Sequence, residues 1–122
     1  MAIDFNSGAN QYCDGAVTGL TADTIGTVAV WCRPETLHDG CLFWIGDTGA
    51  GDHWVRMYLT VGGKATMDCI TVGWDWEYTI DDVFWAAGDL LHIAMTQNGA
   101  APRFFVNGLN VAITLNAAAS SS

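Results

Sequence analysis

The chain has 122 residues, enough for one domain with a hydrophobic core of its own. Its net charge of −9 argues against a protein that binds nucleic acid or anionic membranes, because such proteins use basic patches. Apolar residues make up 51% of the chain and charged residues 14%, and no apolar run approaches the roughly 20 residues of a membrane span.

The N-terminal stretch MAIDFNSGAN has neither a basic region nor an apolar run, so we expect no signal peptide and no export by the usual route. The four cysteines form no Cys-x-x-Cys pair, so their spacing does not indicate a zinc site. In a chain that is not exported, free buried thiols are the default, and sequence alone does not choose among the disulfide pairings. The cysteines are Cys13, Cys32, Cys41 and Cys69.

The N-terminal third predicts four strands. Short strands at 2–5 and 11–13 flank a turn-rich loop. Residues 26–32 (GTVAVWC) are β-branched or aromatic and apolar on both faces, which is typical of a central strand, and Pro34 ends it because proline has no N–H. Residues 40–45 (GCLFWI) form another apolar strand, closed by the Gly-rich loop GDTGAGD.

In the middle third of the chain, two kinds of side chain alternate along the sequence. Residues 55, 57, 59 and 61 are apolar, and the residues between them, 54, 56, 58 and 60, are aromatic, basic or hydroxyl-bearing. This pattern predicts a strand with an aromatic and basic outer face. A Gly-Gly pair at 62–63 predicts a tight turn into a strand over 64–72. In the next strand, 74–78, three aromatic side chains lie on one side and two acidic ones on the other. Residues 79–88 read as a connector with room for a short helical turn.

The stretch 90–115 carries two Asn-Gly pairs, Asn98-Gly99 and Asn107-Gly108, each flanked by strand-forming residues. Asn-Gly is a strong hairpin signal, because a type I′ turn needs positive φ at both central residues. Over residues 109–116, apolar side chains alternate with small or polar ones, which predicts one strand with one buried face. We therefore expect three consecutive antiparallel strands, the last burying Leu109, Val111, Ile113 and Leu115.

Since almost every strong element is a strand, the residues predict an all-β protein. Several motifs also resemble the laminin-G-like branch of the concanavalin A-like β-sandwiches, although the family's Trp two positions before the His is Leu90 here. The resemblance implies an antiparallel β-sandwich of jelly-roll type over residues 1–116, short for the family, and a small polar tail over 117–122. The motifs are Ile3-Asp4-Phe5-Asn6-Ser7-Gly8, Trp31-Cys32-Arg33-Pro34, His92-Ile93-Ala94 and Phe104-Phe105-Val106-Asn107-Gly108.

We predict that the protein is not an enzyme. Glycoside hydrolases of the same superfamily place carboxylates in a Glu-x-Asp-x-x-Glu pattern, and the nearest segment here, Asp75-Trp76-Glu77, is one carboxylate short. His92 has no Ser or Cys in a nucleophile motif to activate, so a packed or hydrogen-bonded histidine is the simpler interpretation.

Asp47 and Asp52 in the loop GDTGAGD are the candidate metal ligands, because some laminin-G-like domains bind one Ca²⁺ through loop carboxylates and carbonyls. A solvated Gly/Asp turn is the alternative that we favour, since two carboxylates are fewer than the roughly six to eight oxygen donors that Ca²⁺ takes. No other cofactor is predicted.

A third candidate site consists of aromatic and basic side chains that would bind a glycan by stacking on sugar rings and donating to hydroxyls. The favoured alternative is a core or protein-interface role, because interfaces are enriched in Trp, Tyr and Arg. The platform would be Trp54, Arg56 and Tyr58, and its rim Trp74, Trp76 and Tyr78.

The sequence therefore favours a non-catalytic subunit that acts through contacts with copies of itself or with a lattice such as a capsid protein. Few charges, many aromatic residues, no export signal and a small polar tail predict a component of the virion surface. A capsid decoration (cement) protein is the first choice and a fibre tip the second. The alternative is a carbohydrate-binding or adhesion module of a secreted or cell-surface protein.

Overall fold

The computed structural model describes residues 25–46, 54–70, 74–98 and 101–118, with the backbone alone for Trp74, Asp75, Ala117 and Ala118. Over these residues the chain forms strands and no helix. The predicted strands at 2–5 and 11–13 lie outside the described residues. The strands are β1 (Ile25–Cys32), β2 (Gly40–Gly46), β3 (Trp54–Leu59), β4 (Ala65–Ile70), β5 (Trp74–Ile80), β6 (Leu91–Asn98), β7 (Arg103–Val106), β8 (Leu109–Val111) and β9 (Ile113–Ala118).

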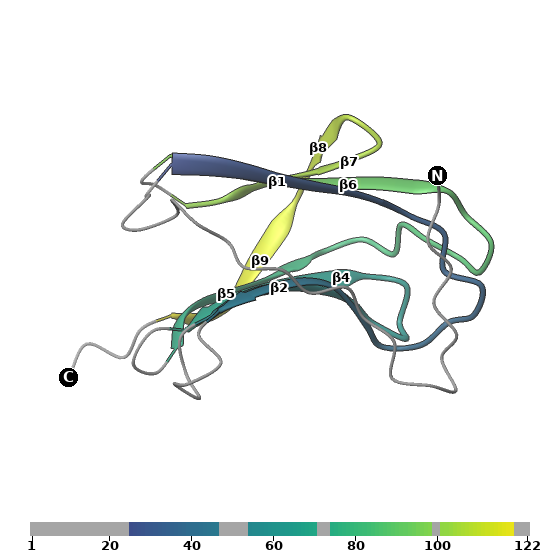
Figure 1. Ribbon diagram of the computed structural model, residues 1–122, viewed down its shortest axis with the longest axis horizontal. Coiled ribbons are helices and arrows are strands. Elements are labelled where there is room, and N and C mark those ends of the chain that lie inside the picture. Colours follow the sequence, from purple (N-terminus) through teal and green to yellow (C-terminus); the bar gives the residue numbers. More distant parts are fainter. Residues whose placement is uncertain (1–24, 47–53, 71–73, 99–100, 119–122) are drawn as a thin grey trace.

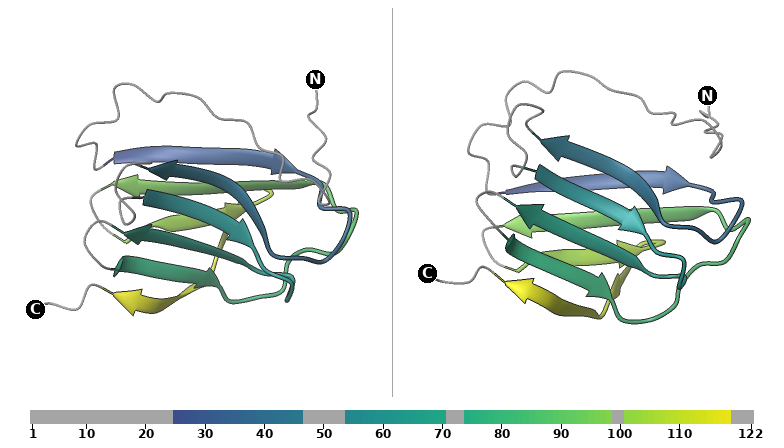
Figure 2. Two further views of the ribbon diagram at one scale, coloured as in Figure 1. Left: turned by 60° about the horizontal axis from the view of Figure 1, so that its bottom comes forward. Right: turned by 90° about the horizontal axis from the view of Figure 1, so that it is seen from below.

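The strands form two sheets that lie face to face (Figure 1). One sheet has four strands in the order β1-β6-β7-β8, and the other has five in the order β2-β3-β4-β5-β9. Every neighbouring pair is antiparallel. Figure 2 shows the five-stranded sheet from its outer side, with β9 along one edge. The prediction of an all-β antiparallel sandwich is confirmed.

The core lies between the two sheets. Met57 of β3 pairs with Met67 of β4, and both side chains are fully buried. In the opposite sheet, the Ile93 side chain is 0% exposed and that of Phe104 is 1% exposed. Because both sheets contribute, burial of apolar surface holds the two layers together. The core cluster consists of Met57, Leu59, Ala65, Met67, Ile80, Trp85, Leu91, Ile93, Met95, Phe104 and Val106.

The turn at Asn107-Gly108 has the predicted geometry. Asn107 (φ 50°) and Gly108 (φ 82°) both have positive φ, and Val106 pairs directly with Leu109, as in a two-residue type I′ hairpin. The Asn107 Oδ1 also accepts a hydrogen bond from the His92 N–H at 2.9 Å, and the Asn107 N–H donates to the His92 carbonyl at 2.8 Å. The asparagine therefore shapes the turn and fastens it to β6.

The same signal predicts a two-residue turn at Asn98-Gly99, and this prediction is wrong. Thr96 is the partner of Arg103, so the connection from β6 to β7 is longer than two residues. Asn98 itself pairs with Ile25. The reason is that β6 continues past the end of β7 to pair with the full length of β1.

The predicted single strand over the last arm is also wrong. β8 pairs with β7 in one sheet, whereas β9 pairs with β5 in the other, so the chain crosses between the layers (Figure 1). At the crossing, the Ala112 carbonyl accepts a hydrogen bond from the Asp81 N–H at 3.0 Å, a distant contact that no local pattern encodes. The expected buried face is split as a result: Leu109 and Leu115 are 73% and 47% exposed.

The β3–β4 hairpin closes through glycine, as predicted. The Thr60 N–H donates to the Lys64 carbonyl at 2.9 Å, and the Gly63 N–H donates to the Thr60 carbonyl at 3.0 Å. Gly63 has a φ of 77°. A Cβ there would lie 2.7 Å from Cγ1 of Val83 and 3.0 Å from the carbonyl oxygen of Trp85. Both the backbone conformation and the close approach require glycine.

The connection from β5 to β6 is irregular, as predicted for residues 79–88, and the optional helical turn does not form there. Its anchor is Trp85, which is 3% exposed and donates from Nε1 to the Lys64 carbonyl at 3.0 Å. The Phe84 N–H donates to the Gly63 carbonyl at 2.9 Å. The segment therefore uses its hydrogen bonds to follow the β3–β4 turn rather than to form a helix.

The C-terminal strand is longer than predicted. β9 pairs Ala117 with Glu77 and Ala118 with Trp76, so the sheet takes in the first two residues of the expected polar tail.

Cys32 and Cys41 carry free thiols, and they are half-buried and exposed, respectively. Burial raises the pKa of the Cys32 thiol. Cys13 lies outside the described residues.

Candidate functional site

The platform predicted on β3 is assembled on one surface. Trp54, Arg56 and Tyr58 alternate with core residues of the strand, so they lie on the outer face of the five-stranded sheet. β2 and β4 flank β3 and complete this surface. We call it the β3 face and define it as Trp44, Trp54, Arg56, Tyr58 and Asp68.

Trp44 is a member that sequence reasoning missed. It pairs with Arg56 across β2 and β3, and its side chain is 43% exposed. The run GCLFWI is apolar throughout, so it gives no alternation from which to read the outward side. A register shift between Cys41 and Phe43 then decides which residues of β2 point outward.

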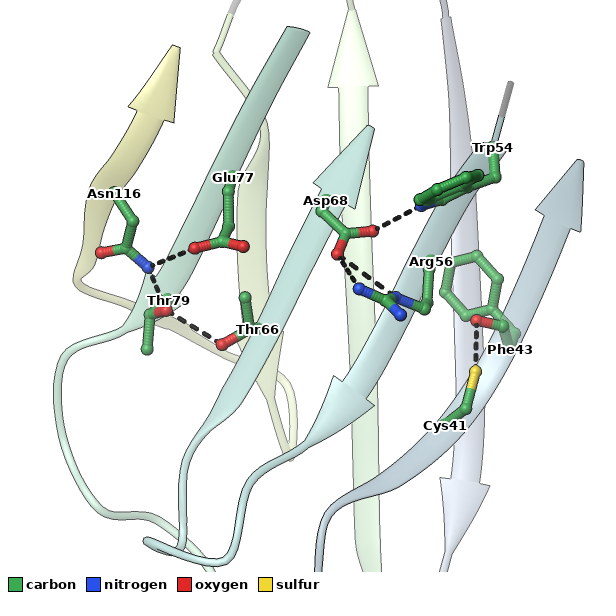
Figure 3. Close-up of polar contacts among 9 residues, drawn as sticks. All are labelled: Cys41, Phe43, Trp54, Arg56, Thr66, Asp68, Glu77, Thr79 and Asn116. Atoms are coloured by element: carbon green, nitrogen blue, oxygen red, sulfur yellow. Dashed lines mark hydrogen bonds and ion pairs between the residues drawn. The ribbon is translucent and has the colours of Figure 1, made fainter. Parts of the chain in front are cut away.

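Asp68 is the second member that was missed, and it is the buried centre of the face (Figure 3). Its Oδ1 accepts a hydrogen bond from Nε1 of Trp54 at 3.2 Å. Its Oδ2 accepts from Nε of Arg56 at 3.2 Å and from Nη2 at 2.5 Å. A single acidic residue in a mostly apolar strand is a signal for such a site, because a buried charge needs a partner.

Arg56 is held on two sides. Its hydrogen bonds to Asp68 raise the pKa of the guanidinium, which stays charged. Its Cζ also lies 4.7 Å from the centre of the Tyr58 ring, a cation–π contact. The guanidinium carries further N–H donors in a rigid fork, and these make no hydrogen bond within the described part of the chain. Arg56 is therefore a pre-positioned cation with donors to spare.

A polar row continues the β3 face across β4, β5 and β9 (Figure 3). Nδ2 of Asn116 donates to Oε1 of Glu77 at 3.1 Å and to Oγ1 of Thr79 at 2.5 Å. The Thr79 hydroxyl in turn lies 2.9 Å from that of Thr66. Burial, together with the nearby carboxylates, raises the pKa of Tyr58 although its hydrogen bond with Thr66 acts the other way.

The thiol of Cys41 lies near this cluster and points its Sγ at the Phe43 carbonyl, 3.2 Å away. Burial raises its pKa, and the opposing effect of Arg56 is smaller. The thiolate is the nucleophilic form of cysteine, so the environment of Cys41 disfavours nucleophilic chemistry at neutral pH.

Two of the three residues of the predicted rim are not at this surface, as the favoured alternative of a core role expects. Trp76 and Tyr78 pack against the core on the inner side of β5, with ring centres 5.9 Å apart. Alternation separated the two sides of this strand, but it did not tell which side faces the other sheet. The side chain of Trp74 lies outside the description.

The predicted metal ligands, Asp47 and Asp52, lie outside the described residues. Within those residues no group of three or more His, Cys, Asp or Glu side chains could hold a metal ion. The calcium site therefore stays a prediction.

The β3 face thus offers aromatic surfaces and a fixed guanidinium, and the polar row beside it offers hydroxyl and amide groups, an arrangement suited to binding. Comparison of the chain with protein-family models, with curated proteins and with solved structures finds no match in any of the three. No helix among the described residues is long and apolar enough to cross a membrane.

Proposed function

We propose that the protein is a non-catalytic structural subunit that acts through contacts with other protein subunits. The supporting observation is an exposed tryptophan on the outer face of each sheet: Trp31 is 69% exposed and Trp44 is 43% exposed. Antiparallel sheets that face water carry polar side chains on that side. Tryptophan is instead enriched at protein interfaces.

Composition supports the same proposal. Only 14% of the residues are charged, so little of the surface is covered by charge. Other large apolar side chains are exposed among the described residues, including Ile25 at 72% and Leu109 at 73%. Contacts with neighbouring subunits in an assembly would remove these side chains from water.

A capsid decoration protein at the virion surface is the assembly that the sequence predicts, with a fibre component second. In such assemblies symmetry repeats one modest interface many times, and affinity grows with the number of contacts.

The test is the mass of the full chain in solution, measured by sedimentation velocity over a wide range of protein concentration. The proposal predicts an oligomer and no turnover of polysaccharide or peptide substrates. A stable monomer with a defined sugar ligand, or with hydrolytic activity, contradicts it.

A carbohydrate-binding module is the second candidate, and one observation favours it. Arg56, fixed by Asp68 and Tyr58 and paired with exposed Trp44, presents N–H donors that no described residue uses, beside an aromatic plane. A glycan array probed with the wild type, with Trp44→Ala and with Trp31→Ala separates the candidates. A lectin loses its ligand in Trp44→Ala and keeps it in Trp31→Ala, whereas a structural subunit retains no glycan in any of the three.

A further inference from the structure

Three connections close one end of the sandwich, the end at which β1, β3 and β5 finish (Figure 2). They are the β1–β2 loop, the β3–β4 turn and the β5–β6 connection. We call the surface that they form the loop end and define it as residues 33–39, 60–64 and 81–90.

Hydrogen bonds join the three connections into one ordered surface. The Val61 N–H donates to Oδ1 of Asp39 at 2.7 Å, which ties the β3–β4 turn to the β1–β2 loop. The Gly88 N–H donates to the Pro34 carbonyl at 2.7 Å, which ties the β5–β6 connection to the same loop. The bonds of Phe84 and Trp85 to the β3–β4 turn complete the set. A partner that binds the loop end therefore meets segments that are already ordered, which lowers the entropic cost of binding.

Large apolar side chains are exposed on the loop end, and each connection contributes at least one. Val83 lies against the turn that carries Val61, because a Cβ added at Gly63 would be 2.7 Å from Cγ1 of Val83. Apolar side chains that gather at a surface, with polar residues around them, are typical of contact sites for other proteins. These side chains are between 49% and 66% exposed: Leu37, Val61, Val83 and Leu90.

The same surface is acidic, with five carboxylates against the two cations Arg33 and Lys64. Lys64 donates from Nζ to a backbone carbonyl of the β5–β6 connection. Two of the carboxylates serve the loops themselves: Asp39 binds the β3–β4 turn, and Oδ2 of Asp89 accepts from the Ala86 N–H at 2.8 Å. The other three are exposed and make no hydrogen bond or ion pair with a described residue: Glu35, Asp81 and Asp82.

Charge decides which partner fits the loop end. A second copy of the chain would bring carboxylates against carboxylates on molecules that each have a net charge of −9, so self-association through this surface is disfavoured. Nucleic acid and anionic membranes are repelled for the same reason. A basic protein surface is attracted, because Lys and Arg can donate to the carboxylates that the loops leave unused.

We propose that the loop end binds a positively charged surface of a different protein subunit, one that presents Lys or Arg beside apolar side chains. The inference rests on the proposed function, for which it names the contact surface and the chemistry of the partner. The partner's cations meet the three unused carboxylates, and its apolar side chains cover Leu37, Val61 and Val83. Attraction between the negative chain and a positive partner also accelerates their association.

An NMR titration of the full chain tests the inference, with a short peptide of alternating Lys and Val as the probe. At low salt we expect saturable shifts of backbone amide resonances in the loop end. A peptide with Glu in place of Lys is expected not to bind, and one with Ser in place of Val is expected to bind more weakly. Raising the salt concentration is expected to weaken binding of the Lys–Val peptide.

Two pairs of variants locate the contact. Asp82→Asn is expected to weaken binding of the Lys–Val peptide by up to about fivefold. Its control, Glu77→Gln, also removes one carboxylate, but on β5, and it keeps an acceptor for Asn116. Val83→Ser is expected to weaken binding several-fold, whereas Ile25→Ser is not, because Ile25 begins β1 at the opposite end of the sandwich. Val83 and Ile25 are both β-branched and exposed, so neither substitution disturbs the core.

A peptide that binds equally to both members of either pair overturns the inference, because net charge alone or another surface then attracts it. Absence of saturable binding overturns it too. The proposed function is judged separately by the mass of the chain in solution. An oligomer whose loop end binds no basic peptide leaves the structural subunit standing, whereas a stable monomer with a defined sugar ligand contradicts the proposed function independently of the peptide result.

Discussion

At the scale of single residues, the Arg56–Asp68 pair is the most informative feature, because its two members are unequally buried. The Arg56 side chain is 35% exposed, whereas that of Asp68 is fully buried. Removing either one breaks the same contact but leaves a different charge behind. The unequal burial therefore predicts unequal costs for the two truncations.

We expect Asp68→Ala to lower the free energy of unfolding by about 2 kcal/mol, because water can solvate the abandoned guanidinium. Arg56→Ala is expected to cost more, about 3 to 5 kcal/mol, because it leaves a buried carboxylate whose remaining donor among the described residues is Trp54. Urea denaturation of both variants and of the double variant measures the order and the coupling. Equal losses of unfolding free energy in the two single variants would contradict this account of the cluster. So would a double variant whose loss is the sum of the two single losses.

Tyr58 gives a prediction about alkaline pH. Its pKa in the folded protein lies above the ordinary value of 10.0, so the unfolded chain loses the tyrosine proton first as pH rises. The stability that burial of neutral Tyr58 contributes is therefore complete below about pH 10 and is lost as pH rises through the folded pKa.

Tyr58→Phe removes the titrating group and keeps the ring beneath Arg56. We expect its free energy of unfolding to fall less steeply above about pH 10 than that of the wild type, as followed by urea denaturation at a series of pH values. The thiols of Cys32 and Cys41, whose pKa values are raised from 9.0, are present in both proteins and cancel in the comparison. Parallel pH profiles would show that Tyr58 carries no such effect.

At the scale of elements, two glycines with positive φ differ in their surroundings. A Cβ at Gly108 would meet no atom within 4 Å, whereas one at Gly63 would meet the Val83 side chain and the Trp85 carbonyl. We expect Gly108→Ala to cost about 1 kcal/mol, from backbone strain alone. Gly63→Ala is expected to cost clearly more, because backbone must move as well as a side chain.

Thermal or urea denaturation of the two glycine variants provides the measurement. Val83→Ala combined with Gly63→Ala is the control, since it removes the Cγ1 that lies 2.7 Å from the added Cβ and should restore part of the loss. Equal costs at the two glycines would mean that the β5–β6 connection does not press against the turn.

The elements also show where sequence reasoning stops. Clean alternation in β3 placed Trp54, Arg56 and Tyr58 together, and the pair Asn107-Gly108 predicted its turn, because both signals are local. The all-apolar run of β2 hid the outward direction of Trp44. The crossing at Ala112 depends on a hydrogen bond from Asp81, a residue distant in sequence, and no periodicity encodes it.

At the scale of the whole molecule, the two outer faces have different chemistry. The β3 face holds the ordered cluster around Arg56 and Asp68, whereas the strands of the four-stranded sheet carry no Asp or Glu. Both carry an exposed tryptophan, and the proposed contacts with other subunits would cover these side chains. The sandwich therefore supports a function that depends on the surfaces it presents to neighbours.

Hydroxyl-radical footprinting of the full chain, at low and at high protein concentration, tests this claim directly. The labelling of each tryptophan reports how much of its side chain solvent reaches. We predict that labelling of Trp31, of Trp44 or of both falls as the concentration rises, while that of buried Trp85 stays low throughout. Undiminished labelling of both Trp31 and Trp44 up to the highest concentration would contradict the claim that neighbouring subunits cover these faces.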